Sequence, residues 1–165
     1  MTRRIAMWSG PRNISTTMMR SFENRADTAV TDEPLYAHYL TVTGHIHPMQ
    51  EDILSAQSGD WREVVAGLTT DTPAPVWFQK HMTQHITPNM DLGWLASLDH
   101  FFLIRDPRLM APSFLRKMGT ARPEDLGLDQ ELVLFREVER LTGKAPPVVD
   151  ANDVLNNPEA VLTKL

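Results

Sequence analysis

Short apolar runs alternate with longer amphipathic segments along most of this chain. The apolar runs have the length of buried strands, and the segments between them are long enough to form crossover helices. Repeated strand–helix–strand units of this kind are typical of a parallel sheet covered by helices. The predicted strands are Ile5–Trp8, Thr28–Thr31, Val76–Gln79, Phe101–Ile104 and Val148–Val149, of which the second depends on the residues TAVT alone.

The amphipathic segments predict helices between these strands. The clearest is Asp129–Thr142, where Leu132, Phe135, Val138 and Leu141 recur every three residues and charged side chains occupy the other faces. Four further helices are predicted at Ser15–Asn24, within Asp60–Leu68, at Leu92–Leu98 and at Leu109–Lys117.

Composition narrows the class of protein. The chain has 165 residues, 42% of them hydrophobic and 22% charged, which is typical of a single globular domain over residues 1–165. The 16 Lys and Arg residues against 21 Asp and Glu leave a net charge of −5, so we expect no nucleic-acid partner. The sequence has no cysteine, no signal peptide and no stretch that could span a membrane, which predicts a cytoplasmic protein without membrane contact.

The last residues, NNPEAVLTKL, predict a short helix with Asn157 as its N-cap and Pro158 at its first helical position. The chain stops about two turns later, and so short a helix is marginal unless it packs on something. We therefore expect this chain to be the front part of a longer protein. A naturally short terminal helix is the alternative.

The residues SGPRNISTT follow the first predicted strand and open the first predicted helix. Against the nucleotide-binding pattern G-x-x-x-x-G-K-[ST], Gly10 and Thr17 fit, but Ser15 replaces the second glycine and Thr16 the lysine. The main cation for the β- and γ-phosphates of ATP is therefore missing. Backbone amides at a helix start still bind anions, and Arg12 offers a planar guanidinium to a phosphate. The alternative is that Ser15 only caps a helix after a Gly-Pro turn.

A second candidate site lies in FFLIRDPRLMAPSFLRK. Arg105 follows the fourth predicted strand, and Ser113 lies eight residues further on, in a predicted helix. Ligands of doubly wound sheets bind outside the carboxyl ends of the strands, so this pair could hold a second phosphate. The alternative is an ion pair between Arg105 and Asp106 and an incidental helical serine.

A third strand end, in VWFQKHMTQHI, carries Lys80 and His81. A lysine and a histidine at this edge can act as electrostatic stabiliser and general base. His81 and His85 also have the spacing of a helical metal pair. No third ligand is evident and the glutamate of the HExxH pattern is absent, so we expect no metal site.

Together the three strand ends resemble the sulfotransferases that use 3′-phosphoadenosine-5′-phosphosulfate (PAPS). The family pattern P-[KR]-S-G-T-T is matched by Pro11–Thr16, its Arg and Ser eight residues apart by Arg105 and Ser113, and its Lys and His after a strand by Lys80 and His81. The tail VVDANDVLNNPEAVLTKL is similar to the family's late strand and helix. The S-G-P-R-N start resembles a bacterial sulfotransferase-like branch.

The resemblance implies a three-layer α/β fold of the P-loop type, with about five parallel strands in the order 2-3-1-4-5 and helices on both faces. It also implies PAPS as sulfuryl donor, a small-molecule acceptor and no obligatory magnesium ion. His81 would accept the acceptor's proton, while Lys80 and Arg12 would stabilise the leaving phosphate. The donor would be bound at its 5′ end by Arg12, Asn13, Ser15, Thr16 and Thr17 and at its 3′-phosphate by Arg105 and Ser113.

The sequence departs from the family pattern at two points. Ile14 replaces the loop glycine, and the chain ends before the family's distal basic-glycine segment. A nucleoside or nucleotide kinase-like enzyme and a non-catalytic nucleotide-binding module therefore stay open, as does homo-oligomer formation. Glu33, Tyr36 and His38 are candidates to line an acceptor pocket; their alternative role is a helix start with Tyr36 packed inward.

Overall fold

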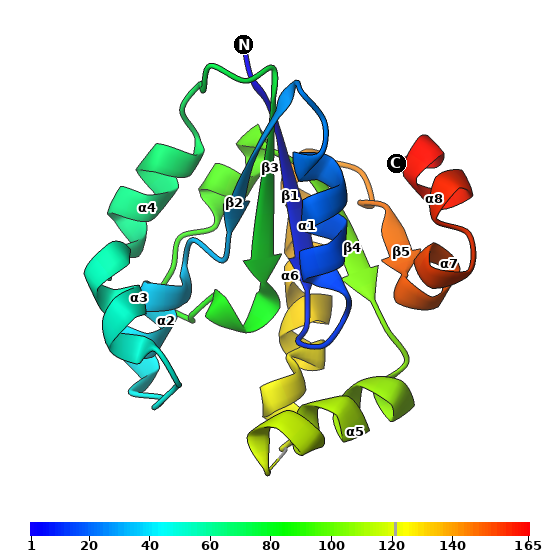
Figure 1. Cartoon of the computed structure of the whole chain (residues 1–165). Helices are drawn as coiled ribbons and strands as arrows, with labels where there is room; N and C mark the ends of the chain where they lie inside the picture. The colour runs from blue at the N-terminus through cyan, green and yellow to red at the C-terminus, as the bar shows by residue number, and fades with distance from the viewer. Residues whose placement is uncertain (121) are drawn as a thin grey trace.

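A parallel sheet forms the centre of the computed structural model, which describes residues 1–120 and 122–165 (Figure 1). Within these residues the sheet has five strands in the order β2-β3-β1-β4-β5, and every neighbouring pair is parallel. This confirms the fold and the strand order implied by the resemblance. The strands are β1 (Arg3–Ser9), β2 (Thr28–Asp32), β3 (Val76–Met82), β4 (Asp99–Ile104) and β5 (Val148–Asp150).

β3 is longer than the sequence pattern predicts, and this changes the place of two candidate site residues. The pattern ends the strand at Gln79, whereas the structure continues it to Met82 because its pairing with β1 continues that far. Lys80 and His81 therefore lie inside β3 and not after it. Because successive strand residues point to opposite faces of a sheet, these two side chains lie on different sides.

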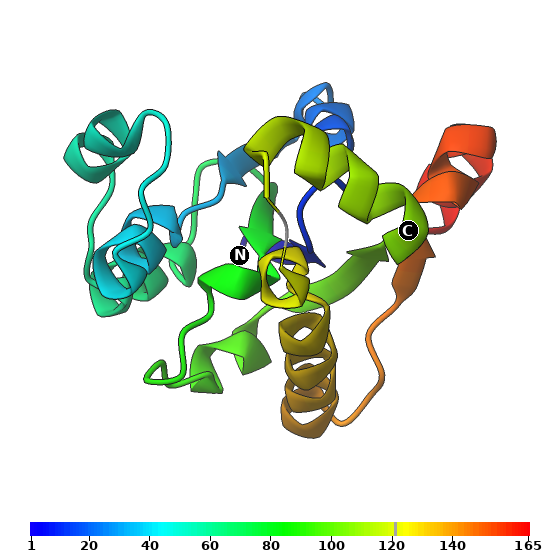
Figure 2. The same cartoon turned by 90° about the horizontal axis from the view of Figure 1, so that it is seen from below.

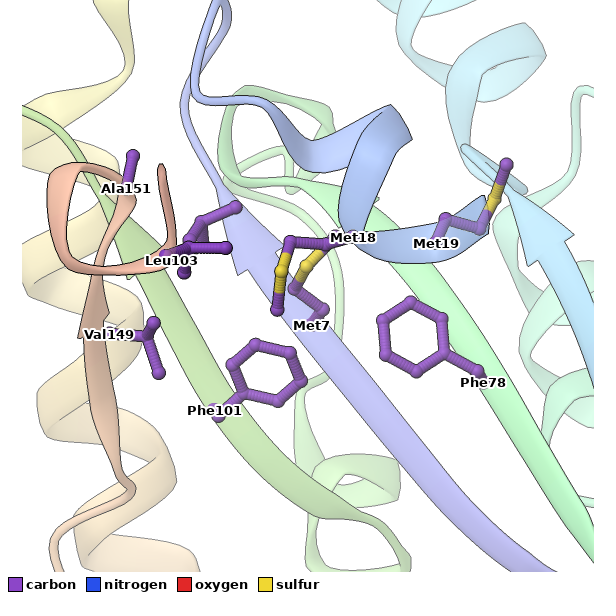
Figure 3. Close-up of a cluster of buried hydrophobic side chains, with 9 residues drawn as sticks. Met7, Met18, Met19, Phe78, Phe101, Leu103, Val149 and Ala151 are labelled. Carbon is purple, nitrogen blue, oxygen red and sulfur yellow. The ribbon is translucent and has the colours of Figure 1, made fainter. Parts of the chain in front are cut away.

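The alternation along the strands divides the core between the two faces of the sheet. One cluster joins the sheet to α1 (Ser15–Glu23) and α7 (Ala151–Asn156) and is drawn in Figure 3. It contains Met7, Met18, Met19, Phe78, Phe101, Leu103, Val149, Ala151 and Val154. The other cluster joins the opposite face to α6 (Leu128–Thr142) and the 3-10 helix η2 (Gly93–Ser97). It contains Ala6, Trp8, Leu95, Leu98, Phe102, Leu134 and Val138. Helices thus cover both faces, as the three-layer fold requires.

Four predicted α-helices are present with small differences at their ends, but the fifth is wrong. The segment predicted at Leu92–Leu98 forms a 3-10 helix, with Leu95 N donating to Leu92 O (3.0 Å) and Leu98 N to Leu95 O (3.2 Å). Such tight turns are common in short connecting segments. The predicted helices are observed as α1 (Ser15–Glu23), α4 (Trp61–Leu68), η2 (Gly93–Ser97), α5 (Pro107–Met118) and α6 (Leu128–Thr142).

Further helices occupy segments to which the sequence pattern assigned no helix. The exception is α2, which was considered as a helix start after the second strand. These elements are α2 (Tyr36–Thr43), α3 (Gln50–Ala56), η1 (Thr83–His85), η3 (Pro123–Leu126) and α7 (Ala151–Asn156). None of the helices in the described residues is long and apolar enough to cross a membrane.

The last helix, α8 (Pro158–Lys164), begins as the sequence predicts. The side chain of Asn157 accepts a hydrogen bond from Ala160 N at 3.2 Å, which confirms Asn157 as the N-cap. Val161 and Leu162 pack against the same core cluster as α1 and α7. This packing stabilises a helix that would be marginal alone.

All strands run in the same direction and end at one edge of the sheet (Figure 1). Figure 2 looks onto this edge: α5, in yellow-green, crosses it, and the cyan segment with α2 and α3 lies to one side. The candidate site residues come from the loops and helices gathered here.

Candidate functional site

A cleft of about 620 Å³ opens at the carboxyl edge of the sheet. Its walls come from the β1–α1 loop and the start of α1, from α2 and the loop after it, from the end of β3 with η1, and from the segment between α5 and η3. Of the residues predicted for the site, Arg12, Ser15, Thr16 and Lys80 line this cleft. Ligands of open parallel sheets bind at this edge, so the cleft is the candidate site.

The loop between β1 and α1 contains two left-handed residues, Arg12 (φ 63°) and Ile14 (φ 57°). Ile14 occupies the N-cap position of α1, so Ser15 is the first helical residue and not the cap. Within the described residues the N-cap makes no side-chain hydrogen bond, which leaves the first amides of α1 open to an anion. Thr17 is exposed on α1, outside the cleft lining.

Asn13 has a different place from the one predicted. Its side chain is fully buried, and its Nδ2 donates to the carbonyl oxygen of Leu103 on β4 at 2.9 Å. Asn13 therefore holds the loop against the sheet. Its Oδ1 is buried and has no hydrogen-bond partner in the part of the chain that the structure describes.

Arg12, Arg105 and Ser113 meet beside the cleft, although they lie far apart in the sequence. Arg12 Nε donates to Ser113 Oγ on α5 at 3.0 Å, and Arg105 Nη1 donates to the backbone oxygen of Arg12 at 2.7 Å. Arg105 Nε is buried, and no described residue accepts its hydrogen bond. The expected alternative of an Arg105–Asp106 pair is not formed, because Asp106 caps α5 and binds Arg108 at 2.7 Å.

Lys80 is a buried cation with two carboxylate partners. Its side chain is 2% exposed, and Nζ contacts Asp32 Oδ1 at 2.6 Å and also Glu33 Oε1. Both acids lie at the end of β2, the neighbouring strand, and Glu33 has a left-handed backbone (φ 46°). Charge pairing of this kind is what allows a lysine to be buried in the charged state.

His81 lies on the other side of β3 and does not line the cleft. Its ring stacks on Trp8 with centroids 4.4 Å apart, and its Nε2 is 3.3 Å from Gln79 Oε1. Burial lowers the pKa of His81 to about 3, with His100 and Lys80 adding to the effect. The imidazole is therefore neutral, and within the described residues its Nδ1 has no partner.

His85 in η1 is the histidine that lines the cleft. It is 3% exposed and lies against Tyr36 and Tyr39, with ring centroids 4.7 Å and 5.0 Å away. Burial, followed by the charge of Lys80, lowers the pKa of His85 to about 3. No described residue contacts His85 Nδ1 by a hydrogen bond.

Of the acceptor-pocket candidates after the second strand, Glu33 and Tyr36 line the cleft and His38 does not. His38 is buried, with Nδ1 3.0 Å from Gly59 O and Nε2 3.0 Å from Thr87 Oγ1. Its role is to join α2 to two neighbouring loops. The half-buried Tyr36 combines a packing contact with a place in the cleft wall.

The two histidines with metal-pair spacing do not share a helix, since His81 lies in β3 and His85 in η1. The described residues contain no group of three or more His, Asp or Glu side chains placed to hold a metal ion. The cleft offers the buried cation of Lys80, the exposed cation of Arg12, the open amides of α1 and the neutral imidazole of His85.

Several residues that line the cleft were not predicted from the sequence. Phe114 and Lys117 of α5 and Arg122 and Asp125 of η3 line the wall opposite α2. The only local signal was that Phe114 and Lys117 lie close to the candidate Ser113 in the sequence: Phe114 is the next residue, and Lys117 lies about one helical turn further on. Nothing in the sequence around Arg122 indicates that η3 packs over the β1–α1 loop.

Comparison with known proteins identifies the family. The family model described as a sulfotransferase domain matches residues 3–165. The chain belongs to this sulfotransferase family. Two curated relatives from Arabidopsis thaliana, branched-chain-amino-acid aminotransferase-like proteins 2 and 1, are 33% and 32% identical to it over 162 residues. These matches cover 98% of this chain but 29% of each relative, so the sulfotransferase domain spans less than a third of their length.

Solved structures similar to the sulfotransferase domain include shikimate kinases. That of Bacteroides thetaiotaomicron has a TM-score of 0.52 and 11% identity, with 98% of each chain covered. That of Aquifex aeolicus has a TM-score of 0.46 and 16% identity, with 98% of this chain and 96% of that chain covered. At this identity the first likeness shows the P-loop kinase fold and nothing about the reaction.

Proposed function

We propose that this sulfotransferase domain binds PAPS and transfers its sulfuryl group to a small-molecule acceptor in the cleft. The observation that carries the proposal is the meeting of Arg12, Arg105 and Ser113, from three separate segments, beside the open start of α1. A donor with phosphates at both the 5′ and the 3′ position would use this cluster fully, whereas ATP would not.

The residues present fit such a donor. Arg105 Nε is buried and has no partner in the described chain, so it is an unused hydrogen-bond donor. The side chain of Arg12 donates to Ser113, and Arg105 donates to the backbone oxygen of Arg12. We propose that Arg105 and Ser113 bind the 3′-phosphate, and that Arg12 with the hydroxyls and amides of Ser15 and Thr16 binds the 5′ end. Arg12 would then leave Ser113 as the donor enters.

The bound donor supplies an activated sulfuryl group: the acceptor oxygen bonds to sulfur, the bond from sulfur to the 5′-phosphate oxygen breaks, and the acceptor proton passes to a base. The domain contributes position and electrostatics. Lys80 and Arg12 are the cations that we propose for the charge on the leaving phosphate. Because Asp32 and Glu33 already hold Lys80 in place, little reorganisation is needed as that charge develops.

For the base, we propose His85 in place of the sequence-based candidate His81. His85 lines the cleft, whereas His81 stacks on Trp8 on the other side of the strand. The low pKa of His85 keeps its imidazole neutral and able to take a proton. The negative charge of a bound donor would raise that pKa and make the imidazole a stronger base.

The donor is tested by calorimetry with adenosine 3′,5′-bisphosphate and AMP. We expect the bisphosphate to bind at least about tenfold more tightly, since a charge-assisted hydrogen bond contributes about 1.5–3 kcal/mol. Arg105→Ala should remove this preference, and Arg116→Ala, which deletes an exposed arginine of α5, should not. Equal affinities for the two nucleotides would overturn the donor assignment. Magnesium-dependent turnover of ATP would favour the kinase-like alternative.

The base is tested by a matched pair of variants, His85→Phe and His81→Phe, each of which keeps an aromatic ring in its stack. With an acceptor found by screening radiolabelled PAPS, we expect His85→Phe to slow transfer by about 10²–10⁴-fold at unchanged bisphosphate affinity. His81→Phe should keep the rate. The reverse pattern would restore His81 as the base. Bisphosphate binding without transfer to any acceptor would favour the non-catalytic module.

A further inference from the structure

Five aromatic rings form a continuous wall on one side of the cleft. Tyr36 is parallel to His85 (centroids 4.7 Å apart, interplanar angle 8°), and Tyr39 contacts the same imidazole at 5.0 Å. His47 meets the edge of Tyr36 at 5.5 Å, and His45 stacks on Tyr39 at 5.6 Å with an angle of 13°. All five residues line the cleft. This set is called the ring wall below.

Three rings of the ring wall, the half-buried Tyr36 and Tyr39 and the buried His85, are uncharged at neutral pH. Burial raises the pKa of Tyr36 to about 12 and also raises that of Tyr39, so both phenols keep their protons. The same burial keeps His85 neutral. These three rings therefore offer π faces and neutral hydrogen-bonding groups to an acceptor.

The other surfaces of the cleft agree with a neutral acceptor. Glu33 is paired with Lys80, and Asp125 is paired with Arg122 at 3.1 Å. Glu124 and Lys117 also line the cleft, and because their charges are of opposite sign they add no net charge that would favour an ionic acceptor. Phe114 of α5 adds an apolar side chain to the lining. The cations Arg12 and Lys80 are those that the donor would use.

One buried atom points to the acceptor's reacting group. His85 is 3% exposed, lines the cleft, and has an Nδ1 for which the described chain provides no hydrogen-bond partner. Buried polar atoms are nearly always paired in folded proteins. A hydroxyl group brought into the cleft beside the ring wall would supply the missing partner.

Resting on the proposed sulfotransferase function, we infer that the acceptor is a neutral molecule with a planar aromatic ring next to its hydroxyl group. The ring packs on Tyr36 and Tyr39, and the hydroxyl donates its hydrogen bond to His85. Tyr36 and Tyr39 are then the residues that determine the choice between aromatic and aliphatic acceptors.

The test compares benzyl alcohol with cyclohexylmethanol, two primary alcohols of similar size and acidity that differ in the planarity of the ring. Their binding to the protein saturated with adenosine 3′,5′-bisphosphate is measured by ligand-observed NMR titration. We expect benzyl alcohol to bind about tenfold more tightly, the upper range for an aromatic pair. Tyr36→Leu should remove most of this preference, Tyr36→Phe should keep it, and Val42→Ala, an exposed change on the same helix, should leave it unchanged.

The matching pair Tyr39→Leu and Tyr39→Phe repeats the test if Tyr36→Leu does not fold. Equal binding of the two alcohols, tighter binding of cyclohexylmethanol, or no detectable binding of benzyl alcohol would each overturn the aromatic assignment. So would a preference that survives both leucine substitutions. Because the readout is acceptor binding, these results do not depend on turnover. Failure of the bisphosphate to bind would instead be a failure of the proposed function.

Discussion

At the scale of single residues, Ile14 carries an unusual backbone conformation. It has φ 57° and ψ 17°, in the left-handed region that is a true outlier for a β-branched residue. The sulfotransferase pattern that the loop resembles has glycine at this position. Glycine fits because it takes the left-handed conformation without steric cost, whereas isoleucine does not. Ile14 also packs against the core cluster on the α1 face, which offsets part of the strain.

This strain predicts an unusual order of stability at position 14. Ile14→Gly and Ile14→Ala lose similar packing, but only glycine relieves the left-handed backbone. We expect Ile14→Gly to be more stable than Ile14→Ala by about 1 kcal/mol in urea denaturation. At Arg136, an exposed position inside α6, the order should reverse, with alanine more stable than glycine by about 1 kcal/mol. If alanine were more stable than glycine at position 14 as well, the loop would be unstrained.

At the scale of elements, the β1–α1 loop is held between the sheet and η3. Gly10 is buried, and a Cβ atom on it would lie 2.6 Å from the backbone oxygen of Leu126 in η3. Asn13 fixes the other side of the loop to β4. The position of the loop that carries Arg12 therefore depends on an element more than a hundred residues later in the chain.

This close approach predicts that Gly10→Ala destabilises the protein by about 1–3 kcal/mol, the usual cost of overpacking, because a backbone atom must move. It should also weaken bisphosphate binding, since the loop moves with η3. Gly67 in α4 provides the control, because a Cβ there meets nothing within 4 Å. Gly67→Ala should stabilise by up to about 1 kcal/mol in the same urea titration. A neutral Gly10→Ala would mean that η3 does not restrain the loop.

At the scale of the whole molecule, buried titratable groups on different elements determine how stability depends on pH. His81 and His85 have pKa values of about 3, below the ordinary 6.5, because burial disfavours their charged forms. Glu131 at the start of α6 is shifted the other way, since burial raises its pKa to about 8 from 4.5. The unfolded chain therefore binds more protons than the native one at the two histidines below pH 6.5, and fewer at Glu131 between pH 4.5 and 8.

These shifts predict a maximum of stability near pH 6.5. Below it, the free energy of unfolding should fall by up to about 1.4 kcal/mol per pH unit for each histidine, opposed by Glu131. Above it, Glu131 alone should lower stability by up to about 1.4 kcal/mol per unit as the pH approaches 8. Urea denaturation from pH 5 to pH 8 checks both limbs.

Glu131→Gln should remove the decline above the maximum and be more stable than the original protein at pH 8, because glutamine resembles the protonated acid. The control Glu137→Gln changes a carboxylate of α6 that is paired with Arg140 and has a lowered pKa. It should leave the profile above pH 6.5 unchanged. If stability still declined above pH 6.5 in Glu131→Gln, another titratable group would be responsible for that decline.

Local features of this protein could be predicted from the sequence because they depend on neighbouring residues. The apolar runs located the strands, and Asn157 followed by Pro158 located the start of α8. The prediction of an α-helix at Leu92–Leu98 was wrong because hydrophobic spacing cannot distinguish a short 3-10 helix from an α-helix. The motif of Arg105 and Ser113 located two residues that do meet Arg12, but their contact with it needed the fold.

The sequence by itself determined the parallel α/β pattern, the loop before α1 that lacks the lysine of nucleotide-binding loops, and several residues of the candidate site. Only the tertiary structure decided how those residues are used. Pairing with β1 extends β3 and turns His81 away from the cleft, while η1 brings His85 into it. The neighbouring β2 supplies the carboxylates that hold Lys80, and α2 supplies the tyrosines of the ring wall. These contacts join segments distant along the chain, and their geometry depends on strand register and helix packing, which local sequence patterns do not encode.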